Sequence, residues 1–150
     1  MDAPLTKTTP EEEVRGVMGD YYEAIRSADS DRIASFYAPD ILAFDAIGEL
    51  RFEGRDAYKA HWEACMAMCE GMTDPVFEMR DLAVSAGSDV AFGHWLVRCG
   101  GTDPKGETNT FWMRASAGLE RRDDRWVIVH EHNSAPFDPV SNAVMMGLEP

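Results

Sequence analysis

The residues with the clearest chemical potential lie together near the C-terminus, in the stretch Trp126–Pro136 (WVIVHEHNSAP). Its aromatic and β-branched residues predict a strand, and pairing should end at the final proline, which has no backbone N–H to donate. Because successive side chains of a strand point to opposite faces, His130 and His132 share one face. Glu131 and Asn133 share the other. Both faces are apolar early and polar late, which favours a central strand whose last turn opens into a pocket or a polar interface.

Two groups of residues have the spacing of metal ligands. His130 and His132 lie on one face of a strand, but no third ligand is obvious there, so a structural pair that bonds to neighbouring strands or to a partner subunit is favoured. His61, Cys65 and Cys69 recur at every fourth residue and would share one side of a helix. The methionines between them indicate core packing instead of a soft-metal site. We therefore expect no metal ion and no other cofactor.

The rest of the chain lacks the signatures of several common enzyme classes. It has no Ser-His-Asp order, no glycine-rich phosphate loop and no dinucleotide-binding fingerprint. The formal net charge is −13 and the isoelectric point about 4.6, so the electric field of the protein repels nucleic acid phosphates and anionic membranes. We expect neither nucleic acid nor a membrane as a partner, and we interpret the acidity as an aid to solubility.

Cysteine content and hydropathy bear on the compartment. The chain has three cysteines, an odd number, and at 150 residues it can bury a core without disulfide bonds. Its N-terminus has no apolar signal-peptide region, and no apolar run approaches the roughly 18 residues of a membrane span. We expect a cytoplasmic protein.

The elements that must position these residues change type halfway along the chain. Thr9 and Pro10 are a strong helix start, and the glutamate three residues after Thr9 completes a capping box. Two further helices and a short hairpin follow, and after Gly71 the apolar pattern changes from the helical to the strand period. The predicted helices cover residues 10–28, 30–38 and 55–68, and the predicted strands cover 41–45, 50–53, 76–85, 90–99, 108–121 and 126–133.

Helices first and antiparallel strands afterwards indicate an α+β domain. We expect a cone-shaped curved antiparallel sheet with three N-terminal helices on its concave side, and the mouth of such a cone is a natural small-molecule pocket. Residues 1–8 should be a flexible arm, residues 9–137 the domain and residues 138–150 a C-terminal tail. Met145 and Met146 could cover the mouth or belong to a mobile tail, and both interpretations stay open.

Two separated stretches resemble known families. YYEAIRSADSDRIASFYAPDILAFDAIG, with GRDAY after it, is similar in spacing to bacterial ketosteroid isomerase. RRDDRWVIVHEHNSAP is similar to the association domain of calcium/calmodulin-dependent kinase II and its small bacterial relatives. The chain thus looks like a member of the nuclear transport factor 2-like, or SnoaL-like, superfamily over roughly residues 10–137. That resemblance implies the cone fold, but the superfamily includes isomerases, dehydratases, cyclases, hydrolases and assembly domains.

The resemblance to ketosteroid isomerase implies roles for three positions. Asp45 falls where that enzyme keeps its proton-abstracting aspartate, and Tyr21 falls where it keeps an oxyanion-hole tyrosine. The second oxyanion donor falls at Ala117, which can donate nothing. Since losing one such donor costs about 100- to 1,000-fold in rate, the resemblance does not extend to the same steroid isomerisation.

The resemblance to the kinase association domain adds His94 as a third candidate site residue. It also indicates which face of the last strand meets the cavity. His94, Ala117 and Asn133 match pocket positions that are arginines in that domain, so the cationic pocket is lost. The same match implies that Glu131 and Asn133 face the cavity, whereas the two histidines of the strand pack outside it.

Together these observations lead to two hypotheses of different class. In the first, the protein is a cofactor-free isomerase, dehydratase or cyclase that acts on a small hydrophobic or carbonyl-containing molecule, with Asp45 as general base and Tyr21 and His94 assisting. The candidate substrate-binding residues are Trp62, Trp112, Glu131 and Asn133. In the second, the same side chains are structural, and the protein is a non-catalytic ligand-binding or oligomerisation module.

The sheet also suggests an interface. Trp95 and Trp112 are the candidate aromatics for an open sheet face that meets another subunit, because an exposed aromatic face usually finds a partner. We expect a homodimer.

Overall fold

The computed structural model describes residues 7–150, so most of the predicted N-terminal arm lies outside the described residues. Three helices precede most of the strands, as the sequence predicts. The elements in chain order are α1 (Pro10–Arg26), α2 (Ser30–Ala34), β1 (Tyr37–Phe44), β2 (Phe52–Glu53), α3 (Arg55–Met68), β3 (Thr73–Ala86), β4 (Val90–Thr102), β5 (Thr108–Arg122) and β6 (Arg125–Ser134). No helix within residues 7–150 combines the length and the apolar character needed to cross a membrane.

Helix α1 begins as its sequence predicts. The Thr9 hydroxyl accepts a hydrogen bond from the Glu12 backbone N–H at 3.2 Å, and the Glu12 carboxylate accepts one from the Thr9 N–H at 2.9 Å. This reciprocal cap satisfies two N–H groups that have no partner inside the helix. The buried side of α1 consists of Val14, Met18, Tyr21, Tyr22, Ala24 and Ile25.

Helix α2 is shorter than predicted, and the following strand is longer. The prediction ended α2 at Pro39, whereas α2 ends at Ala34 and β1 already begins at Tyr37. The reason is a tertiary contact: the Phe36 carbonyl accepts a hydrogen bond of 2.9 Å from the Ile128 N–H. Pairing with β6 therefore draws this segment into the sheet and places Tyr37 in its buried part.

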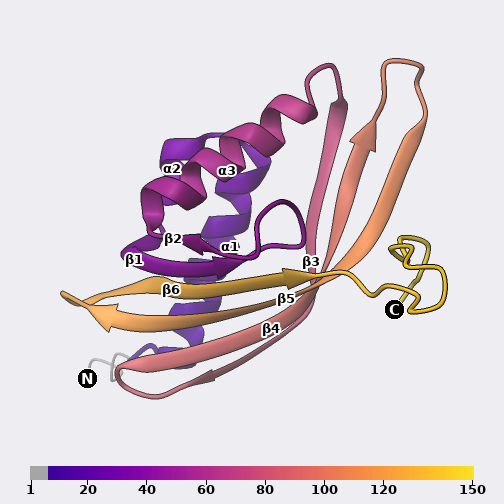
Figure 1. The fold of residues 1–150 in the computed structure, drawn as a ribbon. Coiled ribbons are helices and arrows are strands. Elements are labelled where there is room, and N and C mark those ends of the chain that lie inside the picture. The colour runs from indigo at the N-terminus through magenta and orange to yellow at the C-terminus, as the bar shows by residue number, and fades with distance from the viewer. Residues whose placement is uncertain (1–6) are drawn as a thin grey trace, which may run out of the picture.

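The six strands form one curved sheet in the order β2-β1-β6-β5-β4-β3, with the helices on one face (Figure 1). All neighbours are antiparallel except β1 and β6, which run parallel, so the prediction of a purely antiparallel sheet was wrong at this pair. The ladder shifts register once between β1 and β6, twice between β3 and β4, and once between β5 and β6. Such irregularities increase local bending and twist, and here they accompany the curvature of the sheet around the helices.

The two faces of the sheet carry different side chains. Trp95 is buried on the face that meets the helices, where its indole N–H donates to the Tyr22 hydroxyl at 2.5 Å. The expectation that Trp95 lies on an outer subunit-facing surface was therefore wrong. His94 and its strand neighbours Ser116 and His132 are exposed on the opposite face. We call the helix-covered face the inner face and the other the outer face.

The segment after β6 forms turns outside the sheet. An isolated bridge joins Phe137 and Val144, and the Met145 N–H donates to the Pro136 carbonyl at 2.8 Å. Met145 and Met146 are about two-fifths exposed. Figure 1 shows this segment projecting beyond the end of β6, clear of the three helices. In this arrangement the methionine pair does not cover the helix-lined side.

Candidate functional site

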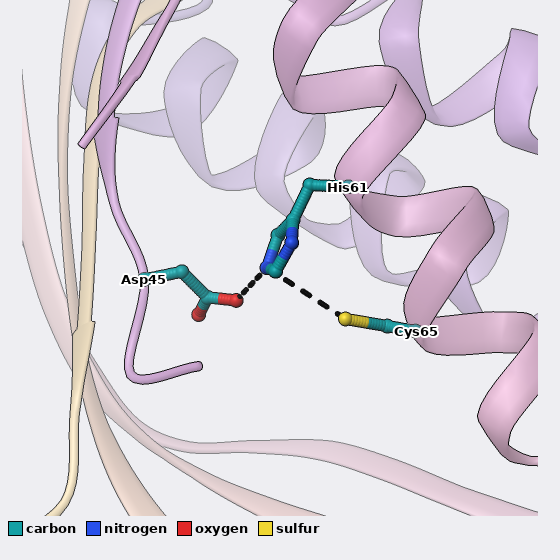
Figure 2. Close-up of side chains that lie close together, drawn as sticks. All are labelled: Asp45, His61 and Cys65. Atoms are coloured by element: carbon teal, nitrogen blue, oxygen red, sulfur yellow. Dashed lines mark hydrogen bonds and ion pairs between the residues drawn. The ribbon is translucent and has the colours of Figure 1, made fainter. Parts of the chain in front are cut away.

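Asp45 directly follows β1 and lies beside helix α3 (Figure 2). Its Oδ2 is 2.5 Å from His61 Nε2, and its Oδ1 accepts the Ala46 backbone N–H at 2.9 Å. The two side chains are sheltered, with 15% of Asp45 and 10% of His61 exposed. A carboxylate held in this way has a fixed direction while keeping some contact with solvent.

His61 is positioned by ring contacts and by a turn. Its imidazole stacks on Phe52, with ring centroids 4.1 Å apart. The turn before β2 contains Gly48 at a φ of +87°, and a Cβ on this residue would lie 3.3 Å from the imidazole Cε1. Glycine thus allows the left-handed turn and the close approach of the histidine ring.

Cys65 lies one helical turn after His61 and adds a third donor. Its Sγ is 3.6 Å from His61 Nε2, at the end of the row drawn in Figure 2. Partial burial, followed by the negative charge of Asp45, raises the pKa of the Cys65 thiol. The thiol is therefore the dominant form at neutral pH in this arrangement.

A second polar group lies deeper, around Glu131 on β6. Glu131 is 3% exposed, and within residues 7–150 it is the one buried charged side chain. Its Oε2 accepts the Tyr21 hydroxyl at 2.7 Å, and its Oε1 accepts the Asn133 amide at 3.1 Å. Each carboxylate oxygen therefore has a donor, as a buried charge requires.

The hydroxyl of Tyr37 extends this group into a directed chain. The Trp62 indole N–H donates to Tyr37 at 2.7 Å, and the hydroxyls of Tyr37 and Tyr21 are 2.5 Å apart. Because each hydroxyl has one proton and Tyr21 donates its own to Glu131, Tyr37 must donate to Tyr21. The protons therefore point in one direction, from the indole towards the carboxylate, and such aligned hydrogen bonds strengthen one another.

Burial changes the acidity of the members of this chain. It raises the pKa of Glu131 to about 7, against the opposing effect of the Tyr21 and Asn133 hydrogen bonds. Burial and the nearby Glu131 carboxylate also raise the pKa values of Tyr21 and Tyr37 well above the usual range. The tyrosines therefore remain neutral donors, whereas Glu131 exchanges its proton near neutral pH.

The structure brings some of the sequence-predicted site residues together. Tyr21 and Asn133 both contact Glu131, and the indole of Trp62 joins them through Tyr37. Asp45 lies next to this group on the inner side, and its charge contributes to the raised pKa of Glu131. The predicted inward parity of Glu131 agrees with this arrangement.

His94 and Trp112 do not lie with the other candidates. His94 is exposed on the outer face because its neighbour Gly93, and not His94, is paired with Ala117 on the inner face. Trp112 also points outward, where the Arg80 guanidinium lies 5.6 Å from its ring centroid. Both side chains therefore lie on the outer face, on the opposite side of the sheet from the Asp45–His61 pair.

Sequence reasoning did not identify two residues of this region. The sequence predicts His61 on the inner side of a helix, in one row with Cys65, but it does not predict the partner Asp45, which follows the first strand. Tyr37 was assigned to a helix. The signal that points to His61 is its inward position on α3, next to the buried Tyr58.

Two shallow depressions of the surface lie elsewhere. One of about 490 Å³ is on the outer face, between Arg80, Arg98, Trp112 and the C-terminal residues. The other, of about 360 Å³, borders β2 and includes Phe52, whose ring stacks on His61. The second depression is therefore one aromatic ring away from the Asp45–His61 pair.

A model of the SnoaL-like domain matches residues 14–138. The chain belongs to the SnoaL-like family. This assignment confirms the predicted superfamily and, with the curved sheet and helices, the predicted fold class. No curated protein matches the chain.

Solved structures agree with the family. A nuclear transport factor 2-like protein of unknown function from Pseudomonas putida is 44% identical, with a TM-score of 0.86 over 93% of this chain and 96% of that one. A Xanthomonas campestris structure named for the calcium/calmodulin-dependent protein kinase II association domain is 21% identical (TM-score 0.73; 89% and 93% covered). A ketosteroid isomerase-like protein from Erwinia carotovora is 14% identical (TM-score 0.68; 85% and 97% covered). The last two share the fold.

Proposed function

We propose that this SnoaL-like protein is a cofactor-independent enzyme that transfers a proton at a carbon atom next to a carbonyl group, in an isomerase, dehydratase or cyclase reaction. The observation that carries the proposal is the sheltered Asp45 carboxylate, held 2.5 Å from His61 Nε2 on the inner side of the sheet. A fixed base within reach of a bound substrate is the main requirement of such a reaction.

In this mechanism Asp45 is the general base. It takes the proton from the carbon, and the electron pair of the broken C–H bond forms an enolate. In an isomerisation Asp45 returns the proton to a second carbon of the substrate. In a dehydration the enolate expels a hydroxyl group, which leaves as water with the same proton. His61 is a positioning residue, since its ring fixes the direction of the carboxylate.

Asn133 is the donor that we assign to the developing enolate oxygen. One N–H of its amide bonds to Glu131 at 3.1 Å, whereas its contact with the Tyr58 hydroxyl is 3.5 Å, at the limit of a hydrogen bond. This second N–H can turn to a substrate oxygen at little cost. Tyr21 is fully buried and already bonded to Glu131, so we assign it the support of Glu131 and Asn133 rather than direct contact.

The shape of the region favours a small substrate. Three tyrosines that are at most 1% exposed fill the deep part of the inner face: Tyr21, Tyr37 and Tyr58. The substrate would therefore bind near Asp45 and Phe52, beside the depression of about 360 Å³, and not deep below Glu131. The two neighbouring carboxyl groups favour a neutral carbonyl compound over an anion.

Hydrogen exchange tests the reaction class without a known substrate. The protein is incubated in D₂O with a panel of β-hydroxy and β,γ-unsaturated ketones, and deuterium incorporation next to the carbonyl is followed by NMR. We expect Asp45→Asn to reduce the exchange rate by at least about 100-fold, the usual contribution of a general base. His94→Gln is the matched surface control and should leave the rate unchanged. Equal exchange with the wild type and Asp45→Asn would contradict the proposal.

The filled interior supports a second candidate, a non-catalytic ligand-binding or oligomerisation module. The outer face offers a surface for a homodimer, because Phe92 is 57% exposed there next to His94 and half-buried Leu96. Under this alternative no ketone exchanges faster with the protein than without it, while self-association persists.

A further inference from the structure

Three different metal-binding side chains converge at one point, and the candidate base Asp45 is one of them. Asp45 comes from the end of β1, and His61 and Cys65 come from adjacent turns of α3 (Figure 2). One donor atom of each lies within 4.8 Å of the other two. The sequence suggested a helical His61-Cys65-Cys69 row, but Cys69 ends the helix and is exposed, and the chain supplies Asp45 in its place.

The spacing of these donors fits one ion of the zinc type. With Zn–N of about 2.0–2.1 Å and Zn–S of about 2.3 Å, a tetrahedral centre places the two donor atoms about 3.6 Å apart. The distance from His61 Nε2 to Cys65 Sγ is 3.6 Å. The carboxylate is closer, with Oδ2 2.5 Å from Nε2. It would have to retreat by less than about 1 Å, because tetrahedral N and O ligands lie about 3.3 Å apart.

The type and access of the donors also favour such an ion. Imidazole, carboxylate and thiolate together suit Zn²⁺ and similar borderline ions better than Mg²⁺ or Ca²⁺, which prefer oxygen ligands alone. The negative charges of the carboxylate and the thiolate would balance the charge of a divalent ion. Asp45 and His61 are 15% and 10% exposed, so an ion can reach them from solvent.

We propose that Asp45, His61 and Cys65 bind a divalent zinc-type ion through three side chains, with a fourth position open to water. This inference goes beyond the proposed function and conflicts with simultaneous base catalysis. A carboxylate oxygen that coordinates the ion cannot also accept a proton from carbon, so metal binding and the metal-free reaction exclude each other. Added Zn²⁺ would then inhibit the exchange reaction, and chelation would restore it.

Cobalt titration of the full chain tests the site independently of activity. Co²⁺ bound to a thiolate gives a charge-transfer absorption in the near ultraviolet, and tetrahedral Co²⁺ gives intense visible bands. We expect both in the wild type, and we expect Zn²⁺ to displace the cobalt. Cys65→Ser should lose the charge-transfer absorption and weaken Zn²⁺ binding at least about 100-fold, because even outer partners of metal ligands contribute about 10- to 100-fold.

Matched variants make each outcome decisive. Cys69→Ser removes the exposed thiol at the end of the same helix, and His94→Gln removes an exposed histidine. Both variants should bind cobalt like the wild type. Absorption that survives Cys65→Ser but disappears in Cys69→Ser overturns the proposal. Binding weaker than about 1 mM in the wild type, detected by calorimetry with Zn²⁺ alone, also overturns it.

The two proposals can fail separately. Cys65 is outside the proposed catalytic group, so Cys65→Ser should keep the metal-free exchange rate when a chelator is present. Without chelator, Zn²⁺ should inhibit Cys65→Ser only at much higher concentrations than it inhibits the wild type. If no ketone exchanges but cobalt binds through Cys65, the metal site stands and the enzymatic proposal fails. If exchange occurs and Zn²⁺ inhibits the wild type and Cys65→Ser equally, the enzymatic proposal stands and the metal site fails.

Discussion

The hydroxyl of Tyr21 donates a 2.7 Å hydrogen bond to the carboxylate of Glu131, although 110 residues separate them in the chain. This bond joins the first helix to the last strand across the inner face of the sheet. It also couples the protonation of a buried acid to the packing of the core, because Tyr21 is fully buried.

Glu131 should make the protein less stable as the pH rises. Folding raises its pKa from 4.5 to about 7, so the folded chain holds the proton more tightly than the unfolded chain. The stability that this proton contributes is complete below about pH 4.5 and is lost as the pH rises through about 7, a total of roughly 3 kcal/mol. Glu131→Gln cannot ionise and should lack this decline, as measured by urea denaturation from pH 4.5 to 8.

The exposed Glu53→Gln is the control for that series, because its side chain is two-thirds exposed. Its free energy of unfolding should follow the wild type across the whole range. Parallel pH profiles of the wild type and Glu131→Gln would contradict the assignment of the pH dependence to Glu131.

Tyr21→Phe should destabilise the protein and shift the same titration. The substitution removes one of the two donors to Glu131, which leaves the ionised carboxylate less satisfied and moves its pKa further upward. A buried group that loses its partner costs about 1–3 kcal/mol. Denaturation at pH 8 should show the larger loss, and denaturation at pH 4.5 the smaller one.

Tyr22→Phe separates this effect from general core damage. Tyr22 is a neighbouring buried tyrosine that accepts from Trp95 and not from the Glu131 group. Tyr22→Phe should also lower the free energy of unfolding, but by the same amount at pH 4.5 and at pH 8.

Gly48→Ala should disturb the Asp45–His61 pair. A Cβ at this position meets the imidazole at 3.3 Å, and the φ of +87° adds backbone strain of about 1–2 kcal/mol. Gly106→Ala has almost the same φ, +85°, but its Cβ would meet nothing within 4 Å. Both variants should lose similar stability. Only Gly48→Ala should change the NMR signals of the His61 ring, and only this variant should slow hydrogen exchange in ketones. An identical response of the two variants would exclude a steric role for Gly48.

Phe92→Lys should weaken self-association through the outer face. A charged side chain at this 57% exposed position would be buried without a partner in a dimer. Light scattering after size-exclusion chromatography should show a dimer for the wild type and a larger monomer fraction for the variant. Leu50→Lys, at a 93% exposed turn position, should leave the mass unchanged. A monomeric wild type at all concentrations would exclude the homodimer.

The sequence predicted the fold and the inward-facing residues of the last strand. It did not predict which side chains from different elements pair with one another. Strand parity places Glu131 and Asn133 on one face of the last strand, and the resemblance to the kinase association domain indicated that this face meets the cavity. The candidate role of His94 came from the resemblance to the kinase association domain alone. In the structure Gly93, and not His94, pairs with Ala117, so His94 lies on the outer face. The position of Asp45 was predicted from a resemblance, but its partner was not.

The remaining differences are tertiary in origin. Local pattern placed Tyr37 in a helix that Pro39 ends, whereas the hydrogen bond from Ile128 to the Phe36 carbonyl draws the segment into the sheet. The pairing of His61 with Asp45 depends on the turn at Gly48 and on the packing of α3. Neither relationship leaves a periodic signal in the sequence.

The parallel pairing of β1 with β6 has a consequence for biosynthesis. A ribosome releases the segment with Tyr21, Tyr37 and Asp45 long before it releases Glu131 and Asn133. Until the final strand emerges, the tyrosine hydroxyls have no carboxylate to receive their protons and β1 has no partner other than the two residues of β2. A nascent chain stalled before residue 131 therefore cannot complete the buried polar chain, whatever helices it has already formed.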